Sequence, residues 1–427
     1  MTTSRTRDTK IFAVVDFVKQ RSRTLLALLL VLVSGVLGAH FVPAARGRSL
    51  AGGPARRPRA FDGAVGPWGK LHYKRIWIEP PPQVLGADRD RGGPRWFFRG
   101  FTPERLHGLF GSLPLPAQAL TDLTLGTRWR ETPEGVWVMP PPDVAASLAP
   151  EARVRIYDVL APFPENRQHA PIPLDADLFD EQLEASHLTA ESAALLRRLV
   201  YPKERWLLFA DELLALSLLR DPGQRTHFLG ALSANPTYLV TLDLDAGADV
   251  DALTRYWALG NRPDDRGSLL RAAADLPGGS TIALEDLLPP FARRLLYTYP
   301  NRALDPALDR RNCFWTALNF FSDAPEDRLA ELGAATERMH TEYTPVSDPT
   351  FGDLVVVLDE RGLPLHAAVY LADQLVFTKN GGGQFHPWIY MTLPDLVDRY
   401  KLLAPANGSV REIYLRHQAH TAGPPPG

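Results

Sequence analysis

A long hydrophobic stretch without any charged residue lies close to the N-terminus. Residues 24–45 contain no Asp, Glu, Lys or Arg, and their centre is almost entirely Leu and Val. A helix of about 20 apolar residues is long enough to cross a bilayer. The pattern therefore predicts a transmembrane anchor over residues 24–45. A cleaved signal sequence is the alternative, because Val42-Pro43-Ala44 offers small residues to a signal peptidase.

The segments on either side of this stretch set its orientation. Residues 1–23 form a basic segment with six Lys and Arg residues against two Asp residues. Basic flanks stay in the cytoplasm, so the body of the chain is expected outside it, periplasmic or extracellular, and secreted if the stretch is cleaved. Residues 46–67 are rich in Gly, Ala, Arg and Pro, which predicts a flexible linker. The chain would then contact the membrane through its N-terminal helix.

The next region, residues 68–289, is predicted to be a mixed, mostly helical domain of unknown role. Alternation over residues 73–78 favours a strand, and Thr102-Pro103 favours a helix start. Residues 206–219 are apolar on nearly every side, which predicts a buried helix. Residues 153–157 fit a strand or a helix equally well. Further helices are expected at residues 188–200, 249–259 and 268–276.

The pattern changes again at about residue 290. A helix that carries Cys313 is followed by short apolar segments separated by turns. These segments predict strands at residues 354–358, 365–371, 374–378 and 410–415, with a helix that begins near residue 392. The layout over residues 290–427 is α+β, with a Cys-bearing helix packed on an antiparallel sheet.

Composition narrows the function classes. The chain has 427 residues, is 45% hydrophobic and 22% charged, and carries a formal net charge of -2. Because Lys and Arg do not outnumber Asp and Glu, the composition does not indicate a nucleic-acid-binding protein. One Cys and dispersed His residues give no recognised ligand spacing, so neither a metal site nor a cofactor is expected. A lone Cys in an exported chain points instead to intermolecular pairing or to a reactive thiol.

Cys313 and His366 are the predicted nucleophile and base. Asn312 precedes Cys313 at a helix start, where backbone N–H groups lower a thiol pKa and favour an oxyanion. His366 begins an apolar strand, and it can take the thiol proton and return it to a leaving amine. A third polar group on the next strand would orient the imidazole. Thr378 and Asn380 project to the same face of that strand, and the sequence leaves the choice between them open.

Three short motifs carry a resemblance to a known family. Asn312-Cys313, then Gly352-Asp353-Leu354, then His366-Ala367-Ala368-Val369-Tyr370 follow in the order and at the spacing of bacterial NlpC-type thiol proteases. The chain resembles these papain-fold cysteine hydrolases over about a quarter of its length. The resemblance implies a papain-like fold and cleavage of amide bonds in peptidoglycan stem peptides.

The resemblance also implies residues that line the substrate site. Tyr299 precedes Cys313 at a distance similar to that of a site-lining Tyr in the family, and Asn312 stands directly before the nucleophile. His386, in the loop after the third strand, is a further candidate for the substrate cleft. Capping of that loop is the alternative role for His386.

Together these features predict an exported, membrane-tethered cysteine hydrolase that cleaves an amide bond in a peptide or peptidoglycan-like substrate. Two alternatives use the same residues. The bulky Phe314-Trp315 pair after the Cys fits a catalytically inactive binding or scaffold module of the cell envelope. An acyl or peptidyl transferase, in which an amine replaces water, would carry the same triad.

Overall fold

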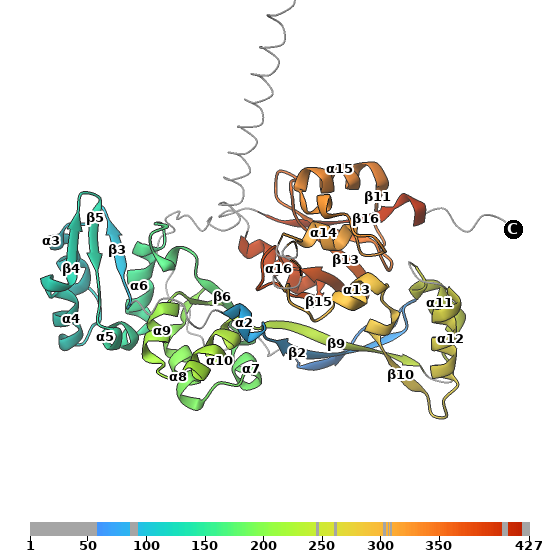
Figure 1. Cartoon of the computed structure of the whole chain (residues 1–427), viewed down its shortest axis with the longest axis horizontal. Coiled ribbons are helices and arrows are strands. Elements are labelled where there is room, and N and C mark those ends of the chain that lie inside the picture. Colours follow the sequence, from blue (N-terminus) through green and yellow to red (C-terminus); the bar gives the residue numbers. More distant parts are fainter. Residues whose placement is uncertain are drawn as a thin grey trace, which may run out of the picture. The chain divides into compact units, whose positions relative to one another are not determined.

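The computed structural model describes residues 58–85, 93–244, 247–259, 263–301, 305, 307, 310–403 and 409–420. It is an α+β structure with antiparallel sheets, as the sequence predicts (Figure 1). The predicted basic segment and membrane anchor, residues 1–45, lie outside the described residues, together with residues 46–57 of the predicted linker. No helix among the described residues has both the length and the apolar character to span a bilayer.

The chain folds as two compact units whose segments alternate along the sequence. The described residues of the first unit come from Arg91–Leu174 and Leu195–Leu218, and those of the second from Leu50–Asp90, Asp175–Ala194 and Leu219–Gly427. The sequence instead predicts consecutive segments, 68–289 and 290–427. The units interleave because a strand near residue 70 pairs with one near residue 240, which brings both into the second unit.

The first unit contains a three-stranded sheet and several helices. The sheet has the order β3 (Trp96–Arg99), β5 (Gly135–Val138), β4 (Trp129–Thr132). The helices are α3 (Pro103–Gly111), α4 (Ala117–Thr124), α5 (Pro142–Ser147) and α6 (Pro150–Leu160). The Thr102 side chain accepts a hydrogen bond from the N–H of Arg105, which confirms the predicted start of α3. Residues 153–157 lie inside α6, so the helix is the correct one of the two predicted alternatives.

The prediction of one buried helix over residues 206–219 is wrong in its first half. Trp206–Phe209 is strand β8, in a small sheet of order β6 (Ile172–Asp175), β8, β7 (Tyr201–Lys203), and Glu212–Leu218 is helix α9. A short run that is apolar on every side fits a buried strand as well as a buried helix. Asp211 lies at the break between the two elements, and its buried carboxylate is bound by α6.

A buried polar network joins α6 to Asp211. Tyr157 Oη donates to Asp211 Oδ1 at 2.5 Å, and the Arg153 guanidinium bonds to Asp211 Oδ2 and to Tyr157 Oη, the latter at 2.9 Å. Arg153 Nη2 also donates to the carbonyl of Ala145 at 3.0 Å. Burial raises the pKa of Asp211, although Arg153 and Tyr157 oppose this rise. The network therefore satisfies a carboxylate that would be very costly to bury alone.

Arg153→Met should destabilise the first unit by about 3–5 kcal/mol, because it leaves the Asp211 carboxylate buried without its cation. Asp211→Leu should cost a similar amount for the converse reason. The double variant should lose much less than the sum of the two. Urea unfolding of the three variants at pH 7 measures these losses, and additive losses would contradict the coupling.

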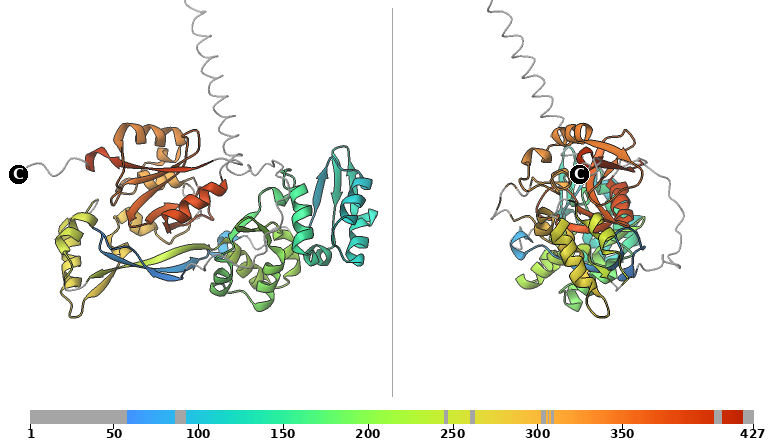
Figure 2. Two further views of the ribbon diagram at one scale, coloured as in Figure 1. Left: turned by 180° about the vertical axis from the view of Figure 1, so that it is seen from behind. Right: turned by 90° about the vertical axis from the view of Figure 1, so that its right-hand side faces the viewer.

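The second unit contains a four-stranded antiparallel sheet. Its order is β1 (Ala60–Asp62), β2 (Lys70–Ile78), β9 (Asn235–Leu244), β10 (Ser280–Ala283). The pairing of β2 with β9 extends along the whole of β2, and the two long strands are visible in the left view of Figure 2. The predicted strand at residues 73–78 is confirmed. β9 was not predicted, although its buried side chains alternate with period two over Tyr238, Val240, Leu242 and Leu244.

Helices surround this sheet. They are α2 (Pro82–Leu85), α7 (Phe179–Ala185), α10 (Pro222–Ser233), α11 (Val250–Trp257), α12 (Pro263–Ala274) and α13 (Pro290–Leu295); helix α8 (Ala190–Leu199) spans the boundary between the units. The predicted helices at 188–200, 249–259 and 268–276 correspond to α8, α11 and α12. Arg75 of β2 is buried, and it binds both carboxylate oxygens of Glu181 on α7 at 3.0 and 3.1 Å.

A six-stranded antiparallel sheet in the second unit carries the predicted site. Its order is β11 (Tyr343–Val346), β16 (Arg411–His417), β12 (Leu354–Leu358), β13 (Pro364–Ala372), β14 (Leu375–Lys379), β15 (Trp388–Thr392). The short helix α14 (Cys313–Leu318) and α15 (Leu332–Glu342) pack on one face, and α16 (Leu393–Leu403) packs on the other. The four predicted strands and the predicted final helix are confirmed, whereas β11, β15 and α15 were not predicted.

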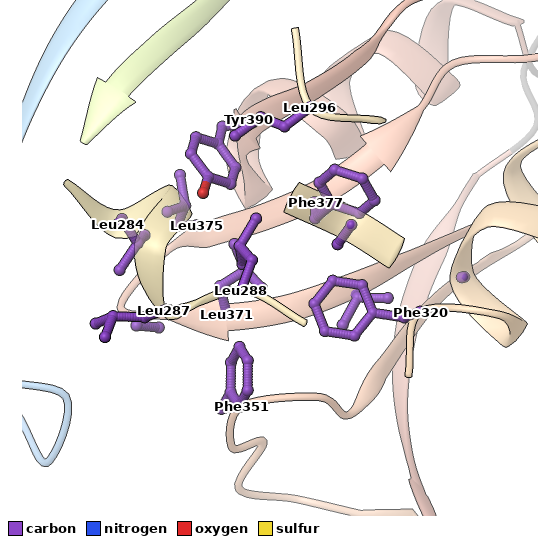
Figure 3. Close-up of a cluster of buried hydrophobic side chains, with 14 of the residues drawn as sticks. Leu284, Leu287, Leu288, Leu296, Phe320, Phe351, Leu371, Leu375, Phe377 and Tyr390 are labelled. Atoms are coloured by element: carbon purple, nitrogen blue, oxygen red, sulfur yellow. The ribbon is translucent and has the colours of Figure 1, made fainter. Parts of the chain in front are cut away.

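Aromatic and aliphatic side chains fill the face under α14. Leu371, Leu375, Phe377 and Tyr390 from the strands gather there with Phe320, which follows α14 (Figure 3). The alternate residues of the same strands face α16 instead. Both faces of the sheet are covered, which explains why β12 and β14 read as continuous apolar runs rather than alternating ones.

The Gly352-Asp353-Leu354 motif fixes the start of β12. Gly352 has a φ of +92°, and a Cβ at this position would lie 2.4 Å from the Phe321 ring, so a side chain cannot be accommodated. Asp353 is buried, accepts the N–H of Thr350 at 2.8 Å and binds Arg416 of β16 at 2.7 Å. The motif that carries the family resemblance therefore has a structural role in joining β12 to β16.

Candidate functional site

Cys313 is the first residue of α14, as the sequence predicts. Asn312 caps this helix, because its Oδ1 accepts the N–H of Trp315 at 3.2 Å. The amide nitrogen of Asn312 donates to the carbonyl of Ala330 at 2.8 Å. The oxygen and the nitrogen of the Asn312 amide thus both form structural hydrogen bonds, and these bonds fix the start of the helix at Cys313.

The sulfur of Cys313 is buried, with only 5% of the residue exposed. Burial raises the pKa of the Cys313 thiol to about 11, against smaller lowering effects from the backbone N–H groups of Ala367 and Phe314 and from the charge of Lys379. The sequence predicts a lowered thiol pKa at this helix start, and that prediction is wrong. The helix has six residues, and its terminal N–H groups do not offset the loss of solvent.

His366 is completely buried at the start of β13. Its Nε2 lies 2.8 Å from Thr378 Oγ1 on β14, and its ring stacks on Tyr400 of α16 with 4.3 Å between centroids. Its Nδ1 is buried and has no hydrogen-bond partner among the described residues. Burial lowers the pKa of His366 to about 3, helped by the positive charge of Arg399. The imidazole is therefore neutral at pH 7.

The Cys313 thiol lies against the strand that carries His366, but no hydrogen bond joins the thiol to the imidazole among the described residues. The sulfur of Cys313 faces the N–H of Ala367, the residue next to His366. The Tyr400 ring that covers His366 also lies close enough to Cys313 for a charge on the sulfur to raise the pKa of its hydroxyl. The two groups are thus a protonated thiol and a neutral imidazole whose Nδ1 has no partner among the described residues, and not a thiolate–imidazolium ion pair.

Of the two candidates for the third group, Thr378 is the one in contact with His366. Asn380 shares its face of β14 but lies beyond the end of the strand, where its Nδ2 bonds to Met391 Sδ at 2.9 Å. The Oδ1 of Asn380 is buried and has no partner among the described residues. The hydroxyl of Thr378, rather than the amide of Asn380, is therefore in place to orient the imidazole.

Tyr299 and His386 are the other two residues predicted for the substrate site. Tyr299 Oη donates to the carbonyl of Ile78 at 2.8 Å and accepts from Asn235, and the residue lines a cavity of about 480 Å³ beside Glu79. No described contact joins Tyr299 to Cys313. The His386 ring lies against Gly381, 3.5 Å from where a Cβ would be, and burial lowers the pKa of His386 to about 3.

Three further residues of the site were not predicted from the sequence. Tyr400 and Arg399 come from α16, whose apolar pattern gives no indication that its last turns reach His366. Lys379 stands between Thr378 and Asn380; it is fully buried, donates to the carbonyls of Gly381 and Gly383, and lies over the Trp388 ring. A Lys inside an apolar strand was a signal that could have been used, because buried lysines are rare.

Among the described residues, no group of three or more His, Cys, Asp or Glu side chains is arranged to hold a metal ion. Comparison with models of known families, with curated proteins and with solved structures gave no match to this chain.

Buried, neutral His366 should make the second unit sensitive to acid. The unfolded chain binds a proton at this position below pH 6.5, whereas the folded chain does so only near pH 3. Stability is therefore present above pH 6.5 and is lost as the pH falls towards 3, by about 3 kcal/mol for this residue at pH 4.3.

The measurement is the urea midpoint of the wild type and of His366→Gln at pH 7 and pH 4.3. The variant should lose less stability on acidification than the wild type. His340→Gln, which removes an exposed imidazole from α15, is the matched control and should lose as much stability on acidification as the wild type. An equal acid loss in His366→Gln and the wild type would contradict the buried neutral state.

Proposed function

We propose that the region around the six-stranded sheet is a papain-like cysteine hydrolase that cleaves an amide bond. Cys313 is the nucleophile, His366 is the general base, and Thr378 positions the imidazole. The observation that carries this proposal is the arrangement of the His366 ring. Nε2 is occupied by Thr378 Oγ1, whereas the buried Nδ1 has no hydrogen-bond partner among the described residues.

The tautomer of His366 follows from this arrangement. A proton on Nδ1 would leave an N–H donor buried without an acceptor, which costs about 1–3 kcal/mol. We therefore assign the proton to Nε2, which donates to Thr378 Oγ1. The lone pair of Nδ1 is then available to accept the thiol proton.

The first chemical step is acylation of Cys313. As the sulfur attacks the amide carbonyl carbon, the thiol proton passes to His366 Nδ1 and a C–S bond forms. The tetrahedral intermediate collapses when the C–N bond breaks, and His366 gives its proton to the leaving amine. Because both resting groups are neutral, the proton is transferred during the attack and not before it. Serine hydrolases transfer their proton in the same way.

The second step is release of the acyl group. A water molecule loses a proton to Nδ1 and attacks the thioester, and the proton returns to sulfur as the carboxylic acid leaves. An amine in place of water would make the same site an acyl or peptidyl transferase. The two activities differ in whether water or an amine accepts the acyl group from Cys313. Identifying the product that carries the acyl group therefore distinguishes them.

Burial of Cys313 favours a second candidate function. Cys313 is 5% exposed and belongs to the hydrophobic core of the second unit, which is how an ordinary core cysteine is placed. A catalytically inactive binding or scaffold module would have this appearance. The two functions differ in one property, which is whether Cys313 accepts an acyl group in the folded chain.

The substrate class rests on the sequence. The predicted export signal and the NlpC-like motifs support an amide in a peptide of the cell wall as the substrate. The predicted anchor would hold the enzyme at the membrane, with its second unit outside the cytoplasm.

The test is acyl transfer to Cys313 from the activated ester p-nitrophenyl acetate, followed by mass spectrometry of the intact protein. The wild type should form an acetyl-enzyme that water releases, and Cys313→Ala should form none. His366→Gln should acylate about 100-fold more slowly, since general-base catalysis is lost. Thr378→Val should slow the reaction about 10-fold, whereas Asn380→Ser should stay close to the wild type.

Release of stem-peptide fragments from purified peptidoglycan tests the substrate. Each variant is first shown to unfold at a temperature close to that of the wild type. If Cys313 of the folded wild-type protein is not acylated at any pH between 6 and 9, the hydrolase function is contradicted. The binding or scaffold module would then be the favoured function.

A further inference from the structure

The cavity of about 480 Å³ beside Glu79 lies wholly within the second unit. Its walls come from the segment that follows β2, from α10 and from the segment that follows α13, and neither Cys313 nor His366 lines it. Pockets that bind small organic molecules usually have volumes of roughly 300–1,000 Å³. The cavity is therefore large enough to bind a small molecule away from the candidate catalytic residues.

Hydrogen bonds fix the walls of this cavity. Tyr299 Oη donates to the carbonyl of Ile78 at 2.8 Å, and the N–H of Tyr297 donates to the carbonyl of Trp388 on β15 at 2.8 Å. Three consecutive prolines, residues 80–82, form another part of the lining, and their rings restrict the backbone. Because the walls are held in place before a ligand arrives, little free energy is lost in ordering them on binding.

Glu79 supplies the one carboxylate among the described residues that line the cavity. Its side chain forms no hydrogen bond and no ion pair with another described residue. Glu79 is half-buried, and burial raises the pKa of its carboxyl group, although the charges of His187 and His227 oppose this rise. A carboxylate that has lost water without gaining a hydrogen bond is costly, and an arriving cation would offset that cost.

The position of the Glu79 carboxylate is given by its contact with α10. A Cβ on Gly230 would lie 2.7 Å from Glu79 Oε2, so a larger residue at this position would push the carboxylate aside. Thr226 lies one turn before Gly230 on the same face of α10, and it lines the cavity. The carboxylate therefore lies against the wall that α10 contributes.

The chemistry of the lining defines the ligand. The prolines and Leu85 offer apolar surface to an alkyl chain, and the Glu79 carboxylate matches a positive charge. A primary ammonium group is compact and has three N–H donors, and a neutral imidazole such as that of His227 can accept one of them. We propose that this cavity binds a small primary alkylamine in its protonated form, with Glu79 as the counter-ion. The proposal does not depend on the hydrolase function.

The first test compares n-butylamine with 1-butanol, two probes of the same length of which only the amine carries a charge. At pH 8 alkylamines are protonated, whereas an imidazole of ordinary pKa is neutral. Binding to the full chain is followed by NMR through the amide signal of Gly230. n-Butylamine should bind at least 10-fold more tightly than 1-butanol, and added salt should reduce this ratio because it screens the charges.

Variants assign the preference to the cavity. Glu79→Gln should lower the affinity for n-butylamine to that of 1-butanol. Thr226→Lys keeps Glu79 but places a tethered ammonium group on the cavity wall, so it should remove the preference as well. Glu337→Gln removes an exposed carboxylate from α15 and is the matched control, in which the ratio should not change. Thermal unfolding checks that each variant is folded.

The outcomes are independent of catalysis. Equal affinities of the wild type for the two probes would overturn the amine site, and so would an unchanged ratio in folded Glu79→Gln or Thr226→Lys. An equal loss in Glu337→Gln would also overturn it, because the effect would then come from net charge. Cys313→Ala should bind n-butylamine as tightly as the wild type, so failure of the amine site and failure of the hydrolase are separate results.

Discussion

The candidate site depends on the burial of one imidazole with one partner. His366 is removed from solvent between β14 and α16, and its ring is held by the Thr378 hydroxyl on one edge and by the Tyr400 ring on one face. Burial favours the neutral form, which keeps Nδ1 able to accept a proton. The same burial keeps the Cys313 thiol protonated. The chemistry proposed for the site therefore follows from exclusion of water rather than from an ion pair.

The six-stranded sheet keeps Cys313 and His366 out of solvent. β12, β13 and β14 are covered on both faces, and the strands hold α14 on one side and α16 on the other. Gly352 and Asp353 fix where β12 begins, and Asp353 ties it to Arg416 on β16. The register of β13 against β12 then sets where His366 stands, opposite Val357. The Gly352-Asp353-Leu354 motif thus has no catalytic role of its own, but it helps to position His366.

Much of the C-terminal fold could be predicted because its strands are short apolar runs separated by turns. The sequence also predicted Cys313 at a helix start and Thr378 as one of two partners for His366. It did not predict the thiol pKa, because local capping by Asn312 says nothing about how deeply α14 is packed. The parts that α16 contributes, Arg399 and Tyr400, arise from packing across the sheet, which no local pattern encodes. The same limit explains the break at Asp211, whose partners Arg153 and Tyr157 are more than fifty positions away.

The state of the His366 ring is the central claim, and ¹⁵N NMR of selectively labelled histidine observes it directly, because the two ring nitrogens have different shifts in each tautomer and in the imidazolium. The account predicts a neutral ring at pH 7 with the proton on Nε2, unchanged down to about pH 4, and loss of this signature in Thr378→Val. An imidazolium at pH 7, or a neutral ring with its proton on Nδ1, would contradict it.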